Sequence, residues 1–208
     1  MNLLSGYRKQ MNKKVFKVHP IMIPFFLFFY LSGEIAVYSI LFGSLLFHEL
    51  GHLFAAKLLG IRVNSCTILP YGGEIKMEQF SKNTNTDQLL VILFGPFFTF
   101  LLLIFFSLVD LPQKNIMVFI QFVIFCFNLL PVYPLDGGRA LLLFIPDKYV
   151  EVIGFSLFSS LFIFCVSLYY FPKALSVTIV FLFLALQNYS YWRFRKYKLA
   201  FDYVTKNA

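Results

Sequence analysis

The stretch FHELGHLFAAK, residues 47–57, places two histidines and a glutamate inside a long apolar run. Residues four apart lie on one face of a helix, so His48 and His52 can present two ring nitrogens to the same ion. This is the HExxH pattern of zinc hydrolases, in which the glutamate, here Glu49, acts as general base toward a water molecule. An ionisable group near the centre of a membrane helix costs about 2.5–3.5 kcal/mol on insertion scales, so its presence indicates a function. The alternative is that the three side chains only form hydrogen bonds between membrane helices.

A metal site here needs one more ligand, because a catalytic zinc ion takes three protein ligands and keeps one position for water. Asp136, in FNLLPVYPLDGGRAL at residues 127–141, is the remaining carboxylate deep within an apolar run. The histidine pair and Asp136 each lie about ten residues, roughly 15 Å of helix, before the cytoplasmic end of a predicted span. They can therefore meet at one depth in the membrane.

Two prolines interrupt the apolar run just before Asp136. Pro131 and Pro134 disrupt a helix and free backbone carbonyls, which the membrane interior tolerates only where they pack in protein or face a watery cavity. The sequence therefore predicts a broken helix that leads into Asp136. The alternative is a kinked helix whose second half is capped by the Asp136 side chain.

The composition is that of an integral membrane protein. Of the 208 residues, 59% are hydrophobic, 20% are aromatic and only 13% are charged, where a soluble domain has about 25% charged residues. Long apolar runs predict an all-α polytopic membrane protein with about six transmembrane helices, and they exclude a β-barrel of alternating strands. A basic arm at residues 1–19 precedes the membrane domain of residues 20–191, and a basic, aromatic tail at residues 192–208 follows it. The predicted spans are residues 20–33, 35–59, 88–109, 115–145, 149–171 and 174–191.

The formal net charge is +8, but the basic residues flank the predicted spans instead of forming a patch for nucleic acid. All lysines and arginines except Lys114 and Lys173 fall on the side of the membrane that holds both termini. The positive-inside rule then places the N- and C-termini in the cytoplasm. We expect no nucleic-acid partner.

A polar cytoplasmic segment, residues 61–79, predicts a small β-hairpin. Residues 74–78 alternate as a strand does, and residues 70–73 predict the turn. The hairpin around Gly72 and Gly73 offers an edge on which a substrate strand could add. The alternative is that the hairpin only covers the membrane surface.

Small and aromatic residues mark two further segments. The fifth predicted span carries Gly154, Ser156, Ser159 and Ser160, which favour close contact between helices. The segment YWRFRKYKLAFDYV, residues 191–204, mixes aromatic and basic residues, as anchors at the membrane interface do. A docking site for a partner is the alternative for this segment.

The paired motifs resemble the site-2 proteases, intramembrane zinc metalloproteases that cut membrane-associated substrates. The resemblance is carried by HELGH at residues 48–52, NLLPVYPLDGG at residues 128–138 and the glycine-containing LLPYGGEIKM at residues 69–78. It covers residues 18–190 and is greatest to the sporulation branch, the stage IV sporulation protein FB type, whose members process an inactive sigma-factor precursor. Members of that branch commonly carry a nucleotide-sensing CBS domain after the last span, and we expect none after residue 192.

This resemblance implies one Zn²⁺ per chain with His48, His52 and Asp136 as ligands and Glu49 as catalytic base. It implies a role for Asn128 in orienting the substrate. The implied partners are a membrane-associated protein substrate, such as a pro-sigma factor in sporulation, and membrane regulatory proteins. The implied location is the bacterial cell membrane, including the membrane that surrounds the forespore.

Two other function classes use the same residue types. A zinc-ion transporter can line its pathway with membrane histidines and aspartates, but it favours several histidine-rich segments, whereas this chain concentrates two of its three histidines in one pentapeptide. A proteolytically inactive scaffold that binds client proteins is the second alternative. The presence of every group that hydrolysis needs favours the protease over both.

Overall fold

The computed structural model describes residues 16–20, 22–31, 33, 35–69, 72–78, 80–170 and 175–207. The chain divides into two compact units, Met1–Gln121 and Phe122–Ala208. Most of the predicted N-terminal arm, residues 1–15, and two residues of the predicted turn, Pro70 and Tyr71, lie outside the described residues.

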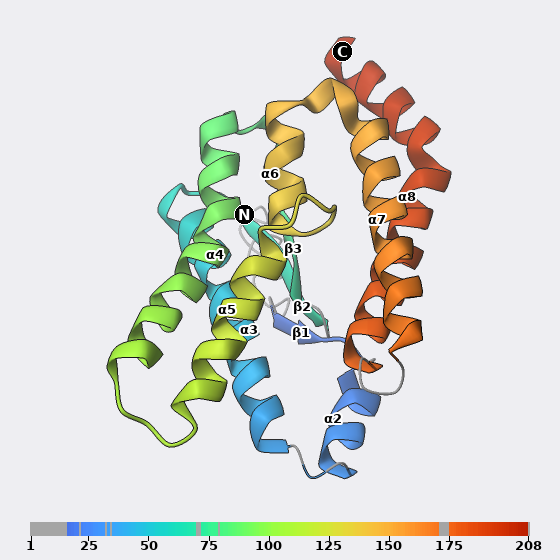
Figure 1. Cartoon of the computed structure of the whole chain (residues 1–208). Coiled ribbons are helices and arrows are strands. Elements are labelled where there is room, and N and C mark those ends of the chain that lie inside the picture. The colour runs from blue at the N-terminus through green and yellow to red at the C-terminus, as the bar shows by residue number, and fades with distance from the viewer. Residues whose placement is uncertain are drawn as a thin grey trace, which may run out of the picture. The chain divides into compact units, whose positions relative to one another are not determined.

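The first unit combines helices with a small sheet (Figure 1). Its elements are β1 (Phe16–Val18), α2 (Met22–Leu31), α3 (Ile35–Leu58), β2 (Val63–Leu69), β3 (Gly72–Met77), a short 3-10 turn η1 (Phe80–Lys82), α4 (Asn85–Leu108) and the start of α5 (Lys114–Asn128).

The sheet has three strands in the order β1-β2-β3, with β1 parallel and β3 antiparallel to β2. The β2–β3 pair confirms the predicted hairpin. The turn is shorter than predicted, because Leu69 already pairs with Gly72 and Ile68 with Gly73, so both glycines belong to β3. Part of the predicted basic arm, residues 16–18, is strand β1. Among the described residues, β3 is an edge strand.

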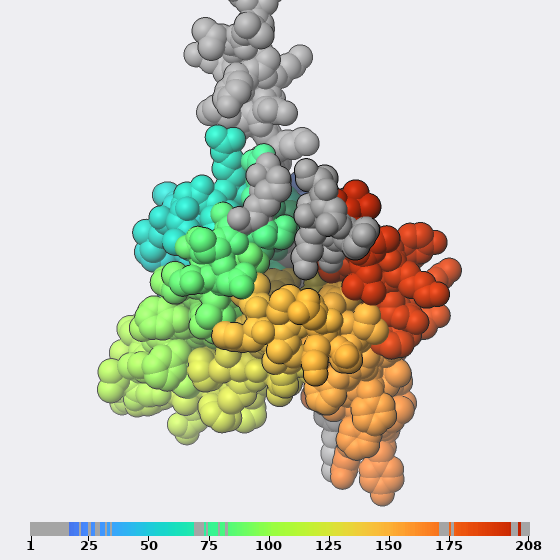
Figure 2. Space-filling view, turned by 90° about the horizontal axis from the view of Figure 1, so that it is seen from above, coloured from blue at the N-terminus to red at the C-terminus, as the bar shows by residue number. Residues whose placement is uncertain are grey.

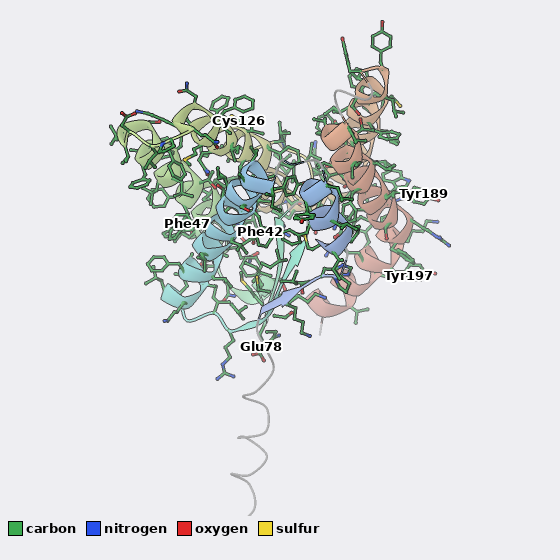
Figure 3. All side chains as sticks on the ribbon, turned by 90° about the horizontal axis from the view of Figure 1, so that it is seen from below. Phe42, Phe47, Glu78, Cys126, Tyr189 and Tyr197 are labelled. Carbon is green, nitrogen blue, oxygen red and sulfur yellow. The ribbon has the colours of Figure 1, made fainter. Side chains whose placement is uncertain are left out.

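Helices α3 and α4 lie side by side in the first unit (Figure 1). Gly51 on α3 makes the approach possible, because a Cβ there would lie 2.3 Å from the Phe94 carbonyl oxygen of α4. The rings of Phe47, labelled in Figure 3, and Phe98 lie 5.2 Å apart across the same contact. Close backbone approach over small residues is the usual way in which membrane helices pack.

The second unit contains the broken segment that the prolines predict. Helix α5 ends at Asn128 and α6 (Asp136–Phe144) begins after a non-helical stretch. A 3-10 turn η2 (Pro146–Lys148), α7 (Tyr149–Tyr169) and α8 (Leu175–Asn207) follow. Figure 2 shows the orange surface of α7 next to the red surface of α8, and the two helices pack along each other.

Three helical stretches among the described residues are long and apolar enough to cross a membrane, namely α3, α4 and residues 146–169. Helix α5 is apolar but shorter. Helix α8 continues without a break from the sixth predicted span into the predicted tail. Tyr189 and Tyr197 on α8 are exposed (Figure 3), and the Arg195 guanidinium lies 4.1 Å from the centre of the Trp192 ring.

A glycine ends α3 and directs the chain into β2. Gly60 has a φ of +70°, in the left-handed region that favours glycine. The Ile61 N–H donates to the Ala56 carbonyl at 2.8 Å and the Gly60 N–H donates to the Lys57 carbonyl at 3.2 Å. This pair of bonds is a Schellman motif, which satisfies carbonyls at the helix end.

Replacing Gly60 by Ala should lower the stability of the folded state by about 1 kcal/mol, because an L-residue is strained at this φ. A Cβ at Gly60 would meet no atom within 4 Å, so the cost comes from the backbone alone. Gly43→Ala is the matched control, because Gly43 lies inside α3 and its added Cβ would also meet nothing. Thermal unfolding in detergent should show a lower midpoint for Gly60→Ala only, and equal midpoints would contradict the assignment.

Candidate metal centre

The two predicted histidines converge at the centre of α3. Their Nε2 atoms lie 3.2 Å apart, and both side chains are buried, with 2% of His48 and 5% of His52 exposed. One ligand atom from each of His48, Glu49 and His52 lies within 4.8 Å of the other two. Among the described residues, these three form the group that could hold a metal ion.

Contacts with α4 fix the orientation of both imidazoles. His52 Nδ1 lies 2.8 Å from the Val91 carbonyl oxygen, which can only accept, so Nδ1 carries the proton. His48 Nδ1 lies 2.9 Å from Thr99 Oγ1, whose hydroxyl donates to the Gly95 carbonyl at 3.3 Å. Thr99 therefore accepts from His48 Nδ1–H. In the neutral form, both rings then direct an Nε2 lone pair to the same place, as metal-binding histidines do.

Gly95 of α4 leaves the space into which these nitrogens point. A Cβ at Gly95 would lie 2.3 Å from Nε2 and Cε1 of His52 and 2.8 Å from Nε2 of His48. No side chain other than hydrogen fits there without moving a ring. The missing side chain therefore keeps the nitrogen pair accessible from the α4 side.

The Glu49 carboxylate is held by the sheet. The Gly73 N–H of β3 donates to Glu49 Oε1 at 2.6 Å. A Cβ at Gly73 would lie 2.5 Å from Glu49 Oε2, so glycine is needed for this approach. Oε2 is buried and has no hydrogen-bond partner among the described residues. Since an unsatisfied buried carboxylate oxygen is costly, an ion or a water molecule beside Oε2 would stabilise the site.

Cys66 of β2 lies close to this carboxylate but is not one of the three residues whose ligand atoms lie together. The side chain is fully buried. Burial, and secondarily the negative charge of Glu49, raise the pKa of the Cys66 thiol to about 11. Without a metal ion, the thiol is therefore protonated at neutral pH.

Asp136 lies in the second unit, where it is buried at the first residue of α6. The N-cap position belongs to Leu135, which makes no side-chain cap. The structure therefore gives no support to the alternative in which Asp136 serves as the N-cap. Its partnership with the histidines remains a prediction.

The non-helical stretch folds back over the first turn of α6. A Cβ at Gly137 would lie 2.3 Å from the Leu129 carbonyl oxygen, and a Cβ at Gly138 would lie 2.4 Å from the Tyr133 nitrogen. The two glycines after Asp136 are therefore needed for backbone-to-backbone packing. Asn128 is buried, and its Nδ2 donates to the Ile124 carbonyl of its own helix at 3.0 Å.

The sequence did not predict the residues of α4 that contact the two histidines. Thr99, Gly95 and the Val91 carbonyl complete the surroundings of the histidines. A signal was present, because GPFFT at residues 95–99 interrupts a long apolar run with a glycine, a proline and a hydroxyl. Nothing in that segment alone indicates which distant side chain the hydroxyl contacts.

The chain is similar to several known proteins. Residues 36–114 match the model of peptidase family M50. Stage IV sporulation protein FB of Bacillus subtilis is 28% identical over 192 residues, which are 86% of this chain and 67% of that protein. The similarity to peptidase family M50 therefore includes the HELGH motif at residues 48–52.

Two further similarities are to Methanocaldococcus jannaschii, one in sequence and one in structure. A zinc metalloprotease of Methanocaldococcus jannaschii is 31% identical over 122 residues, which are 54% of this chain and 35% of that protein. The solved site-2 protease from the same organism superposes with a TM-score of 0.68 at 22% identity, covering 85% of this chain and 90% of that one. The fold is thus that of a site-2 protease.

The chain is a membrane metalloendopeptidase with zinc as its cofactor. The geometry of the first unit alone fits a zinc ion. It offers two imidazole rings with fixed tautomers and a carboxylate oxygen that has no hydrogen-bond partner among the described residues. It also offers a space that a single Cβ would fill. Nitrogen and oxygen donors of this kind are those of catalytic zinc sites.

Replacing Gly95 by Ala should weaken zinc binding by about 10-fold or more, because the new methyl group would displace the Nε2 atoms of His48 and His52. Zinc per chain, measured after dialysis of the purified protein against a chelator, checks this. Gly43→Ala is the control for an added methyl group without neighbours. Parental zinc retention in Gly95→Ala would show that the ion does not bind between these rings.

Proposed function

We propose that the chain cleaves a peptide bond of a membrane-associated protein at the depth of the histidine pair. His48, His52 and Asp136 would hold the zinc ion, and Glu49 would act as the base. The observation that carries the proposal is the convergence of two Nε2 atoms, 3.2 Å apart, on residues that offer ligand atoms within 4.8 Å of one from Glu49. Burial of all three side chains in an apolar helix favours work on a bond inside the membrane.

Zinc, when bound, supplies a Lewis acid that polarises a carbonyl and makes water a nucleophile at neutral pH. Glu49 is placed to accept and later to donate the proton of that reaction. The Gly73 N–H holds Oε1, which leaves Oε2 to accept a proton from water and later to return it to the leaving amine. Thr99 and the Val91 carbonyl keep the Nδ1 protons of the two rings in place, which leaves the Nε2 lone pairs to hold the ion.

The edge of β3 is the proposed binding place for the substrate chain. The Gly73 N–H points to Glu49 and therefore away from β2. In an antiparallel ladder, residues two apart face the same side, so Ile75 also presents its backbone groups to the edge. A substrate strand that pairs there would be drawn out of its own helix and held beside Glu49. Asn128 is the residue that we propose to orient the bound chain.

Similarity to stage IV sporulation protein FB supports a pro-sigma factor of sporulation as the substrate. The same similarity supports a location in the bacterial cell membrane, including the membrane around the forespore, and control by membrane regulatory proteins. The distribution of basic residues supports cytoplasmic termini.

Replacing Glu49 by Gln should abolish cleavage and leave zinc bound, because the amide keeps an oxygen for the Gly73 N–H but cannot take a proton. General base catalysis contributes about 10²–10⁴-fold, so cleavage should fall by at least that factor. Co-expression with a candidate pro-sigma factor, scored by its shift in size, measures the activity. Retained cleavage by Glu49→Gln would refute the role of Glu49, and an uncut candidate with the parental enzyme would refute that substrate.

Replacing Ile75 by Pro should raise the KM of cleavage by up to about 10-fold, because it removes one edge-facing N–H, worth about 1 kcal/mol. The bond between Gly73 and Glu49 is not part of this change, so the zinc content should stay at the parental level. Ile75→Val keeps the N–H and is the control. An unchanged KM for Ile75→Pro would favour the simpler role of the hairpin as a cover of the membrane surface.

A further inference from the structure

The Leu129 N–H still donates to the Phe125 carbonyl at 3.2 Å, but none of the N–H groups of residues 130–135 makes a helical i→i−4 bond. Backbone polar groups of this stretch therefore need other partners in an apolar setting. At Tyr133, two side chains supply them. The Tyr133 N–H donates to Ser156 Oγ of α7 at 2.9 Å, and the Tyr133 carbonyl accepts from Asn188 Nδ2 of α8 at 2.7 Å. Both backbone groups of one residue are thus held by two different helices.

Ser156 and Asn188, which we name the Tyr133 clamp, are themselves fixed. Both side chains are fully buried. Ser156 Oγ gives its only proton to the Val152 carbonyl at 2.7 Å, so the oxygen must accept from Tyr133. Asn188 Nδ2 also donates to the Leu184 carbonyl at 3.0 Å, which sets the direction of its amide. The clamp therefore presents one acceptor and one donor at fixed places.

The backbone at Tyr133 packs directly against the start of α6. A Cβ at Gly138 would lie 2.4 Å from the Tyr133 nitrogen, so the backbone of the stretch rests directly on the first turn of α6. The Leu135 N–H donates to the Val132 carbonyl at 2.9 Å, and both side chains pack on Phe181 and Leu184 of α8. Asp136 follows at once, and no side-chain cap fixes the helix start. The stretch therefore sets the direction in which Asp136 projects.

We propose that Ser156 and Asn188 are positioning residues for the Asp136 carboxylate, which they hold in the direction that zinc binding needs by clamping Tyr133. This inference rests on the proposed function, in which Asp136 is the third ligand. Polar groups that orient a metal ligand are typically worth 10–100-fold in metal affinity. Because the clamp acts through the backbone, we expect the lower end of that range.

The test measures the zinc affinity of the full-length protein in detergent by competition with a chromophoric chelator. Ser156→Ala removes the acceptor for the Tyr133 N–H, and Asn188→Leu removes the donor to its carbonyl at similar volume. Ser167→Ala is the matched control, since Ser167 is also a buried serine of α7 and donates to a carbonyl of its own helix, Phe164, at 2.7 Å. Thermal midpoints are recorded for every variant, and affinities are measured well below them.

Ser156→Ala and Asn188→Leu should each bind zinc about 10-fold more weakly than the parent, and Ser167→Ala should match the parent. Asp136→Asn distinguishes a failure of the proposed ligand set from a failure of the clamp inference. If Asp136→Asn loses zinc affinity while both clamp variants keep it, the clamp is only structural and the inference is overturned. An equal loss in Ser167→Ala would overturn it as well. If Asp136→Asn keeps parental affinity, the proposed ligand set fails and the inference fails with it. Should Asn188→Leu not fold, Ser156→Ala decides.

Discussion

The close contact of α3 with α4 is the constraint on which the metal centre depends. Glycines on both helices, Gly51 and Gly95, remove the side chains that would hold the backbones apart. Only at this separation do the imidazole rings of α3 reach the Val91 carbonyl and the Thr99 hydroxyl. A larger residue at either glycine would change helix packing and ring orientation together. The same small residues therefore serve both helix packing and chemistry.

Irregular backbone at membrane depth needs partners, and the two units supply them differently. In the first unit, the β2–β3 ladder satisfies most polar groups of the hairpin, and the Glu49 carboxylate takes the Gly73 N–H. In the second unit, no strand is available to residues 129–135, and the side chains of Ser156 and Asn188 take that role at Tyr133. In both units, the irregular backbone contacts or adjoins a proposed site residue. A regular helix would have used the same polar groups for itself.

The local parts of this architecture could be predicted from the sequence, and the long-range parts could not. The spacing of His48 and His52 predicts one helix face, and the prolines before Asp136 predict the break, because both effects act within one turn of the chain. Thr99 lies 51 residues from His48, and no periodicity links the two. The strand at residues 16–18 escaped prediction for the same reason, since parallel pairing with β2 joins distant segments. Three of the predicted spans are long, apolar helices, whereas the span of residues 115–145 consists of two shorter ones.

The hydrogen bond between Gly73 and Glu49 has a consequence for substrate selection. A strand edge pairs only with an extended chain, so under the proposed binding to β3 a transmembrane segment would have to unwind before it reaches the carboxylate. The free energy of that unwinding then enters the specificity of the enzyme, in addition to any side-chain recognition. Segments with weak helix propensity, rich in glycine or interrupted by proline, would be favoured over equally apolar but stable helices. Selectivity of this kind depends on how easily the substrate backbone unwinds around the bond to be cleaved, and it needs no dedicated side-chain pocket.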